Sequence, residues 1–401
     1  MVELEAAVEQ ILAAMPAPTA ERIPLTEAHG RVLQERVFAT VGLPGFDNSA
    51  VDGYAVRAKD LAGARETTPV TLRLVGRVAA GEIFDGELKD GECARIFTGA
   101  PLPPGSDAVA WQEDTRTDAA KPEAVQFFDS VRPWENIRFR GEDLKEGAAL
   151  GEPGDELTAG RINLLAASGF GEISAGRQPK VGFIASGSEL AEAGTALRPG
   201  MIFESNRPGL AALARRAGAV TVIYPLVKDR FADTQAVLKQ AFDECDIVIT
   251  TGGVSVGDTD FIKLAFEKLG GSLEFWKVNM RPGRPFVFGR WRGRFLFGLP
   301  GNPVSAFVTF LLLVRPALRR WQGAKVTGLA AHAGSLAEPV ENRTDRRHLM
   351  RVVVDASGHV RSAGTQASHI MSSLAIANGL LDVPANTTLP AGTVVRVMRW
   401  E

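Results

Sequence analysis

From Lys180 onward, short apolar runs alternate with stretches whose apolar residues recur at helical spacing. The alternation predicts strands separated by helices, because side chains on one face repeat every second residue in a strand and about every 3.6 residues in a helix. Short loops between such units favour a mostly parallel sheet with helices on both faces. The predicted strands are 181–186, 220–227, 246–251, 272–278 and 294–299, and the predicted helices are 207–217, 231–243, 259–269 and 303–320.

The rest of the chain has shorter and weaker patterns. An amphipathic helical stretch opens the chain, short β-like runs alternate with turn clusters over 70–140, and short strands return after 326. We therefore expect a multidomain protein of the α/β plus β class. The expected domains are 1–45 with 141–178 as an N-terminal linker and dimerisation domain, 46–140 as an inserted β-rich domain, 179–325 as the α/β domain and 326–401 as a C-terminal β-barrel-like domain.

Composition is ordinary for a soluble globular protein, with 45% hydrophobic and 23% charged residues among 401. The net charge of −2 argues against a protein built to coat nucleic acid or an anionic membrane, so any anion site must be local. The longest apolar run, at 307–314, is too short to span a bilayer, and the N-terminal stretch lacks a basic signal-peptide region. Cys93 and Cys245 form no CxxC motif, which favours a reducing cytoplasm without zinc or disulfides.

Two loops that follow predicted strands and precede predicted helices are suited to anions. Gly252 and Gly253 open the first loop, which also contains Ser255. In the second loop, Asn302 is a typical N-cap and Pro303 a typical first helical residue. Such strand–loop–helix units direct backbone N–H groups at an oxyanion, although a tight turn alone would also explain the glycines. The glycine loop matches neither a Walker A nor a GxGxxG motif.

The segment between these loops, 277–294, contains several basic residues and no acid. Among them are Lys277, Arg281 and Arg284, and the two arginines flank Pro282–Gly283. Arginine presents a planar fork to oxyanions, and the prolines restrict the backbone that carries it. A solvated surface loop is the alternative interpretation. The position between two anion-suited loops favours a site for an anionic small molecule.

Four acids, Glu189, Asp229, Asp258 and Asp260, each fall just after a predicted strand. Carboxylates beside an anion site are typical of Mg²⁺, which prefers oxygen ligands and often bridges protein to phosphate. For any one of these acids, N-capping of the next helix is the better explanation. Because the carboxyl ends of parallel strands meet at one edge of a sheet, the four acids together favour a metal site.

Other polar residues carry less information on their own. Asp52 and Asp143 lie in polar, glycine-flanked loops and are typical turn formers. Arg351 belongs to a basic cluster with Arg346, Arg347 and His348, for which a solvated face is the simplest interpretation. None of the five histidines occurs in a recognisable motif with a serine or cysteine nucleophile, so a catalytic triad is not supported.

Several segments resemble the molybdopterin molybdenumtransferase family, which includes the bacterial MoeA proteins and the E domain of gephyrin. The segments are PGFDNSAVDGYAV, RIFTGAPLPPGSDAV, NIRFRGEDL, GGVSVGDTD, MRPGRPFVFG, GLPGNPVS and GTQASHIMSS, and they cover nearly the whole chain in the family's order. The resemblance implies a doubly wound α/β domain of the molybdenum-cofactor-biosynthesis type in an elongated four-domain subunit, and a homodimer. It also implies insertion of molybdate into adenylyl-molybdopterin, with Mg²⁺ and release of AMP, in a cleft that two subunits form together.

The family's functional positions transfer to this sequence wherever its motifs match. The implied catalytic acids are Asp52, Asp143, Glu189, Asp229 and Asp260, with Glu189, Asp229 and Asp260 as metal ligands. Together with the loop residues above, the expected substrate-binding set is Thr98, Arg138, Gly252, Gly253, Ser255, Lys277, Arg281, Arg284, Pro300, Asn302, Pro303, Arg351 and Ser368. The chain departs from the family at Ser188, where Asp is frequent, and at Arg281 and Arg284, where Lys is frequent.

Two other functions remain open at the level of sequence. A nucleotide pyrophosphatase is possible because related α/β domains cleave pyrophosphate bonds, and such an enzyme would release AMP without molybdate. A non-catalytic molybdopterin carrier or scaffold is the second alternative, although the chain has no long linker or additional domain that would present partners.

Overall fold

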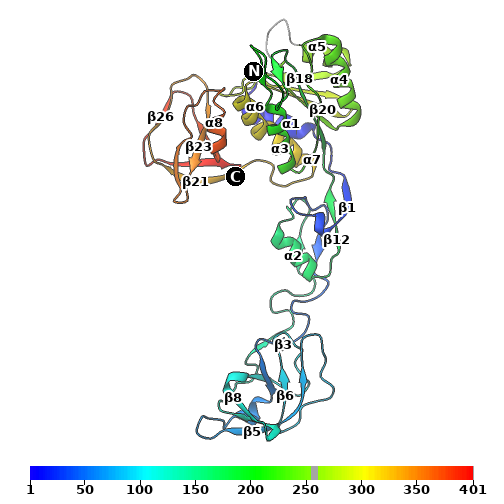
Figure 1. Ribbon diagram of the computed structural model, residues 1–401, viewed down its shortest axis with the longest axis vertical. Helices are drawn as coiled ribbons and strands as arrows, with labels where there is room; N and C mark the ends of the chain where they lie inside the picture. Colours follow the sequence, from blue (N-terminus) through cyan, green and yellow to red (C-terminus); the bar gives the residue numbers. More distant parts are fainter. Residues whose placement is uncertain (254–260, 401) are drawn as a thin grey trace.

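The computed structural model describes residues 1–253 and 261–400, and it shows an elongated molecule (Figure 1). An α/β region and a β-barrel lie side by side at one end, and a separate β-sheet lies at the other end. A narrow region of short paired strands joins the two ends. The expected α/β plus β fold class is therefore confirmed.

The α/β region is built on a six-stranded sheet in the order β16-β13-β17-β20-β19-β18. The first four strands are parallel, and the last two are antiparallel to their neighbours. The sequence predicted a mostly parallel sheet but did not predict β19. The bounds are β13 (Lys180–Ala185), β16 (Val220–Ile223), β17 (Ile247–Thr251), β18 (Ser272–Trp276), β19 (Val287–Trp291) and β20 (Arg294–Leu299).

Helices cover both faces of this sheet, as a doubly wound domain requires. One apolar core contains residues of α3, α6 and α7, and the other contains residues of α4 and α5. The predicted helices are confirmed within the described residues, and the last of them contains a π-helical turn, η4. The bounds are α3 (Asn206–Arg216), α4 (Phe231–Glu244), α5 (Phe261–Lys268), α6 (Pro303–Thr309), η4 (Phe310–Val314) and α7 (Arg315–Trp321).

The N-terminal helix α1 (Leu4–Ala14) packs on the α/β region, against η4 and α7. Its apolar face is buried in the same core as α3, α6 and α7, through Leu4, Ala7 and Ile11. This packing differs from the expected grouping of residues 1–45 with 141–178 in one domain. Amphipathic spacing marks a helix and its apolar face, but it does not say which core that face will join.

A narrow linker region follows α1. The chain leaves the α/β region along one strand of each pair and returns along the other, so the distal sheet is an insertion. Helix α2 (Ala159–Ala167) packs on a small core that includes Leu33, Leu157 and Ile173. The antiparallel pairs are β1 (Ala20–Pro24) with β12 (Glu172–Gly176), β2 (Val37–Phe38) with β11 (Ala149–Gly151), and β3 (Asn48–Ser49) with β10 (Ile137–Arg138).

Two further β structures complete the chain. The distal sheet has the order β7-β4-β6-β5-β9-β8, with β4 (Gly53–Val56), β5 (Val70–Val78), β6 (Glu92–Ile96), β7 (Ala108–Trp111), β8 (Thr115–Asp118) and β9 (Lys121–Phe127). The C-terminal barrel is closed by β21 (Ala330–Leu336), β24 (His359–Ser362), β23 (His348–Val354), β25 (Gly379–Val383) and β27 (Val394–Arg399). Smaller elements are the pairs β14 (Leu190–Ala191) with β15 (Ile202–Phe203) and β22 (Val340–Asn342) with β26 (Thr387–Leu389), and helix α8 (Ser372–Ile376).

Among the described residues, no helix has both the length and the apolar character needed to cross a membrane.

Docking of α1 gives a stability prediction. Replacing the fully buried Ile11 with alanine leaves a cavity between α1 and the helices beneath it. We expect Ile11→Ala to lower the free energy of unfolding by about 2–5 kcal/mol, measured by chemical denaturation. Leu12→Ala is the matched control, because Leu12 is only half-buried and should cost clearly less. Equal losses in the two variants would contradict the packing of α1 described here.

Candidate functional site

A cavity of about 720 Å³ lies at the carboxyl ends of the parallel strands. Ser186 follows β13, Gly252 follows β17 and Pro300 follows β20, and all three line this cavity. The strand order places β17 between β13 and β20, so these three loops are neighbours. We call this cavity the sheet-edge cavity. It occupies the position at which open α/β sheets commonly bind ligands.

The glycine loop needs its glycines for two physical reasons. Gly252 and Gly253 have φ values of 80° and 64°, a region that other residues enter only at a cost. A Cβ on Gly252 would lie 2.9 Å from the carbonyl oxygen of Ser186, and one on Gly253 would lie 2.8 Å from Cγ1 of Ile262. The backbone therefore approaches its neighbours closely at the cavity wall. Ser255, Asp258 and Asp260, also expected here, lie outside the described residues.

Two helices begin at the sheet-edge cavity. Ser205 occupies the N-cap of α3, Asn302 occupies the N-cap of α6 with Pro303 after it, and neither cap side chain bonds to its own helix. The side chain of Asn206 donates to the carbonyl of Gly301 at 2.8 Å and joins the two helix starts. The first N–H groups of a helix have no intrahelical acceptor, and the helix dipole makes that end positive. The cavity is thus suited to an oxyanion.

Glu189 brings a carboxylate to the cavity wall, whereas Asp229 does not line the cavity. The Asp229 carboxylate accepts a hydrogen bond of 2.9 Å from the backbone N–H of Ser188. Within residues 1–253 and 261–400, no group of three or more His, Cys, Asp or Glu side chains could hold a metal ion. The expected third ligand, Asp260, falls outside those ranges. The described residues therefore do not form a protein-only magnesium cage.

A buried ion pair lies at the start of α3, in the wall of the sheet-edge cavity. Glu204, which lines the cavity, accepts hydrogen bonds of 2.9 and 2.8 Å from the backbone N–H and the Nε of Arg207. Arg207 also donates to the Glu192 carboxylate at 2.8 Å. Both members of the Glu204–Arg207 pair are almost fully buried, so the pair fixes the start of α3 rather than offering a free charge.

The basic loop 281–284 lies between the α/β region and the barrel. The backbone of Arg281 bonds to Arg347 and Leu349 at the start of β23, with N–O distances of 3.0 and 2.7 Å. Pro285, one residue beyond this loop, lines the sheet-edge cavity. Burial, with the positive charges of Arg281 and Arg351, lowers the pKa of His348 to about 4, so this imidazole is neutral at pH 7. Arg281 and Arg351 therefore share one positively charged neighbourhood.

Arg351 is fully buried in the barrel, contrary to the solvated face that its sequence context favoured. Its guanidinium donates to the Ser373 hydroxyl at 2.6 Å and to the carbonyls of Thr365 and Ala367 at 2.9 and 3.2 Å. Burial lowers the pKa of Arg351 to about 10. These bonds hold the segment that continues into half-buried Ser368 and then into His369 and Met371, which line the cavity.

The remaining predicted residues lie elsewhere. The Asp52 carboxylate accepts from the backbone N–H and the hydroxyl of Thr98, both at 2.8 Å, and these bonds lower the pKa of Asp52. Asp52, Thr98, Arg138 and Asp143 are exposed, in or near the distal sheet. A single chain therefore keeps these four residues away from the sheet-edge cavity (Figure 1). Arg281 and Arg284 belong to the basic loop and Lys277 precedes it, but none of the three lines the cavity.

Several residues of the cavity were not among those predicted, notably Glu204, Ser205, Asn206, His369 and Met371. Ser205 and Asn206 precede a predicted helix, so N-cap preference could have found them. His369 and Met371 come from the barrel, and only the folded chain brings them to α3, where the Ser205 hydroxyl lies 3.9 Å from the Met371 sulfur.

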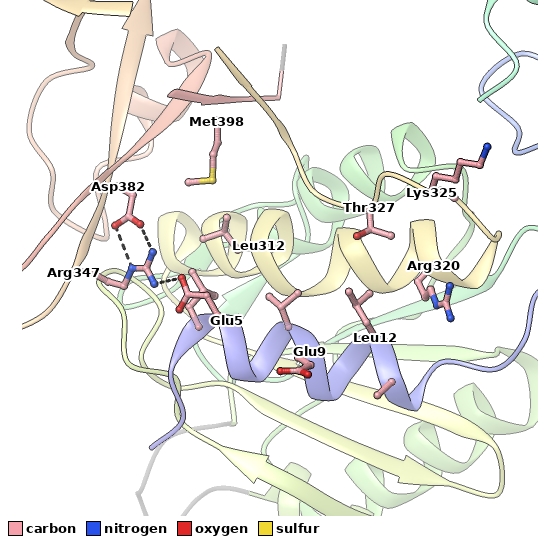
Figure 2. Close-up of a pocket in the computed structure, with 14 residues that line it drawn as sticks. Glu5, Glu9, Leu12, Leu312, Arg320, Lys325, Thr327, Arg347, Asp382 and Met398 are labelled. Atoms are coloured by element: carbon pink, nitrogen blue, oxygen red, sulfur yellow. Dashed lines mark hydrogen bonds and ion pairs between the residues drawn. The ribbon is translucent and has the colours of Figure 1, made fainter. Parts of the chain in front are cut away.

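A second cavity, of about 700 Å³, lies between α1, η4–α7 and the barrel (Figure 2). Arg347 lies at one end of it and is hydrogen-bonded to Asp382 and Glu5. These carboxylates raise the pKa of Arg347. Because its charge is already compensated, this cavity is a weaker candidate for an anion than the sheet edge.

The sequence matches three family models. They are the MoeA N-terminal region (domain I and II) at residues 2–169, a probable molybdopterin binding domain at 182–320, and the MoeA C-terminal region (domain IV) at 333–400. Together these models match most of the chain.

Relatives and solved structures agree with that match. The chain is 37% identical over 384 residues to a molybdopterin molybdenumtransferase of Haemophilus influenzae, covering 94% of this chain and 93% of the relative. It is 39% identical over 386 residues to molybdopterin molybdenumtransferase 2 of Mycobacterium tuberculosis strain H37Rv, covering 94% of each. The crystal structure of a molybdopterin biosynthesis MoeA protein from Pyrococcus horikoshii OT3 aligns over 100% of both chains, with a TM-score of 0.82 and 30% identity. The chain therefore belongs to the MoeA family of molybdopterin molybdenumtransferases, enzymes of molybdenum cofactor biosynthesis.

Proposed function

We propose that this protein inserts molybdate into adenylyl-molybdopterin and releases AMP. The observation that carries the proposal is the sheet-edge cavity, where a glycine loop and two helix N-termini face one space. Both substrates are oxyanions, and the names of the relatives point to the same transfer. The volume of about 720 Å³ lies within the range of small-molecule sites.

The chain's own groups would bind and orient the substrate. The backbone N–H groups that follow Pro303 at the start of α6 are suited to the pyrophosphate oxygens, whereas at the start of α3 the N–H of Arg207 is already bonded to Glu204. The Arg281 guanidinium, in the basic loop beside the cavity, is suited to molybdate. Positive groups placed beforehand would stabilise the charge that develops as the pyrophosphate bond breaks. The sulfur ligands would come from the substrate, since Cys93 and Cys245 are both buried, and burial raises the pKa of Cys93 to about 12. Two free thiols suit a reducing compartment, so we place the enzyme in the cytoplasm.

Magnesium is part of the proposal as an ion that arrives with the phosphates. Mg²⁺ commonly uses one or two protein carboxylates together with substrate phosphates rather than a dedicated protein cage. Glu189 is an exposed carboxylate that lines the sheet-edge cavity, and the Asp229 carboxylate accepts a hydrogen bond from the backbone N–H of the neighbouring Ser188. The ion would neutralise phosphate charge during cleavage.

A homodimer would supply the residues that a single chain keeps apart. Asp52 and Thr98 form a preorganised pair on the distal sheet, and both are exposed. The elongated shape leaves this sheet free to approach another molecule (Figure 1). We therefore propose that the distal sheet of one subunit completes the sheet-edge cavity of its partner.

The first test is whether AMP release depends on molybdate. Purified protein is mixed with adenylyl-molybdopterin and Mg²⁺, and AMP is measured with and without molybdate. We expect molybdate to stimulate AMP release, because the oxyanion is a substrate of the same step. Equal release without molybdate would support the pyrophosphatase alternative instead.

The second test concerns Glu189. Replacing it with glutamine removes one negative charge from the cavity wall while keeping the size of the side chain. We expect Glu189→Gln to raise the Mg²⁺ concentration for half-maximal AMP release by about tenfold or more, since a charge-assisted contact contributes about 1.5–3 kcal/mol. Asp233→Asn, an exposed change on α4 outside the cavity, is the control and should leave the requirement unchanged. An unchanged requirement in both variants would remove Glu189 from the metal site.

The third test asks whether two chains share one site. Asp52→Ala and Glu189→Ala proteins are each expected to be inactive, because each lacks one half of every site. After subunit exchange, the mixture should recover about a quarter of wild-type AMP release, since half of the dimers are mixed and each of these has one intact site. Absence of recovery, with exchange confirmed by tagged subunits, would place the complete site within one chain.

A further inference from the structure

Three strand ends meet at the edge of the distal sheet beside Asp52. Asp52 immediately precedes β4, Thr98 follows β6, and Gln112 follows β7. β4 lies between β6 and β7 and runs antiparallel to both, so the start of β4 and the ends of its two neighbours share one edge. Thr98 and Gln112 therefore lie beside Asp52, and both bond to it.

Asp52 is held through its side chain and through its backbone. Its carboxylate accepts the two hydrogen bonds from Thr98 described above, and its carbonyl oxygen accepts a bond of 3.2 Å from the backbone N–H of Gln112. The bonds from Thr98, and after them the positive charge of Arg95, lower the pKa of Asp52. Asp52 is nevertheless exposed, so an oriented and ionised carboxylate remains accessible to a second molecule.

Arg95 lies on β6, directly opposite Tyr54 of β4. Its guanidinium donates to the carbonyl oxygen of Gly53 at 3.2 Å and to the side-chain amide oxygen of Gln112. Gly53 follows Asp52 in the chain, and Gln112 is the residue whose backbone N–H bonds to the Asp52 carbonyl. One guanidinium thus ties together the two backbone segments that hold Asp52.

Two aromatic rings hold this guanidinium in place. Its central carbon lies 5.0 Å from the centroid of the Tyr54 ring and 5.1 Å from that of the Phe97 ring. Tyr54 is buried and packs edge-on against Phe127 in the core of the distal sheet. Aromatic faces attract a cation, and the planar arginine fork can make two hydrogen bonds at the same time. Few other orientations of the Arg95 side chain would keep all four contacts.

A neighbouring arginine on the same sheet lies in a different environment. Arg77 lies on β5 directly opposite Arg95. Arg77 is exposed and donates to the Glu82 carboxylate at 3.3 Å, whereas Arg95 is half-buried and donates to two neutral oxygens beside Asp52. An arginine at this level of the sheet therefore does not brace Asp52 unless it lies on β6.

We propose that Arg95 is a positioning residue for the reaction at the sheet edge, and that it braces Asp52 so that the carboxylate enters the partner's cavity in a fixed orientation. The inference rests on the proposed function, in which the distal sheet of one subunit completes the site of its partner. A purely structural role would lower the stability of the distal sheet without changing the rate of the folded enzyme.

The first arm of the test needs no turnover. Hydrogen exchange is followed by mass spectrometry on the full-length wild-type, Arg95→Gln and Arg77→Gln proteins. In Arg95→Gln we expect the amides of Thr98 and Gln112 to exchange about tenfold faster or more, because the loss of charge-assisted hydrogen bonds releases the segments around Asp52. Arg77→Gln is the matched control and should keep the wild-type rates. Unchanged exchange in Arg95→Gln would overturn the inference.

The second arm measures molybdate-dependent AMP release. In Arg95→Gln, kcat should fall about tenfold or more, because a displaced Asp52 loses its alignment with the substrate. KM for adenylyl-molybdopterin should stay near the wild-type value, because the sheet-edge cavity that binds the substrate is unaltered. Arg95→Lys keeps the charge but lacks the planar fork, so it should recover only part of kcat. A lower melting temperature with an unchanged kcat would show a structural role and overturn the inference.

The two arms also separate this inference from the proposed function. Wild-type kcat in Arg95→Gln, beside an inactive Asp52→Ala protein, would overturn the role of Arg95 and leave the proposed function standing. Equal AMP release by the wild type without molybdate would contradict the proposed function, and the exchange rates alone would then decide whether Arg95 braces Asp52. If Arg95→Gln does not fold, Arg95→Lys takes its place, and wild-type exchange with wild-type kcat in that variant would overturn the inference.

Discussion

The burial of β17 is the constraint on which the sheet-edge cavity depends. All five residues of this strand are buried, and it pairs in parallel with β13 on one side and β20 on the other. Adjacent parallel strands end at the same edge of a sheet, so the loops that follow these three strands lie next to one another. Gly252 and Gly253 then let the backbone turn away at once, beside the carbonyl of Ser186. The anion-suited geometry is thus a consequence of core packing as much as of the polar residues themselves.

Two arginines in this structure donate hydrogen bonds mainly to neutral oxygens rather than to carboxylates. Arg351 is fully buried and donates to a hydroxyl and two carbonyls, and the half-buried Arg315 donates to two carbonyls. Neutral oxygens satisfy donors but do not cancel charge, so such sites retain a positive potential in a medium of low dielectric constant. Anion affinity and stability of the unliganded protein therefore oppose each other. Replacing one of these arginines by a neutral residue would relieve repulsion while removing the attraction for a ligand.

Local patterns in the sequence predicted the elements well and their partners less well. Periodicity found β13, β16, β17, β18 and β20, and it found the helices, because each carries its own apolar repeat. It missed β19, because the glycine and arginine within residues 287–291 interrupt the apolar run. This strand is recognised in the structure by its antiparallel pairing with β18 and β20. The residues next to Arg351 in the sequence favour a surface position, whereas the structure buries it. The hydroxyl and carbonyls that accept hydrogen bonds from its guanidinium belong to residues 365–373, and the sequence around Arg351 does not reveal them.

Local patterns in the sequence also predicted some residues of the candidate site and not others. Glycine loops, N-caps and strand ends pointed to Glu189, Gly252 and Asn302 at one sheet edge, and the structure places all three in the sheet-edge cavity. His369 and Met371 could not be found by such reasoning, because their position depends on how the barrel docks on the α/β region. The pairing of Asp52 with Thr98 joins loops 46 residues apart, and only the folded distal sheet brings them together.

The slender connection between the two ends of the molecule has a mechanical consequence. The last two strand pairs before the distal sheet, β2 with β11 and β3 with β10, are each only two or three residues long. Ladders this short contribute few inter-strand hydrogen bonds, so few contacts at this connection oppose a rotation of the distal sheet. A small rotation at this connection moves the whole distal sheet, and with it Asp52, which lies between β3 and β4. The position of Asp52 relative to a second molecule would therefore be set by the surface that the distal sheet contacts, and not by this connection.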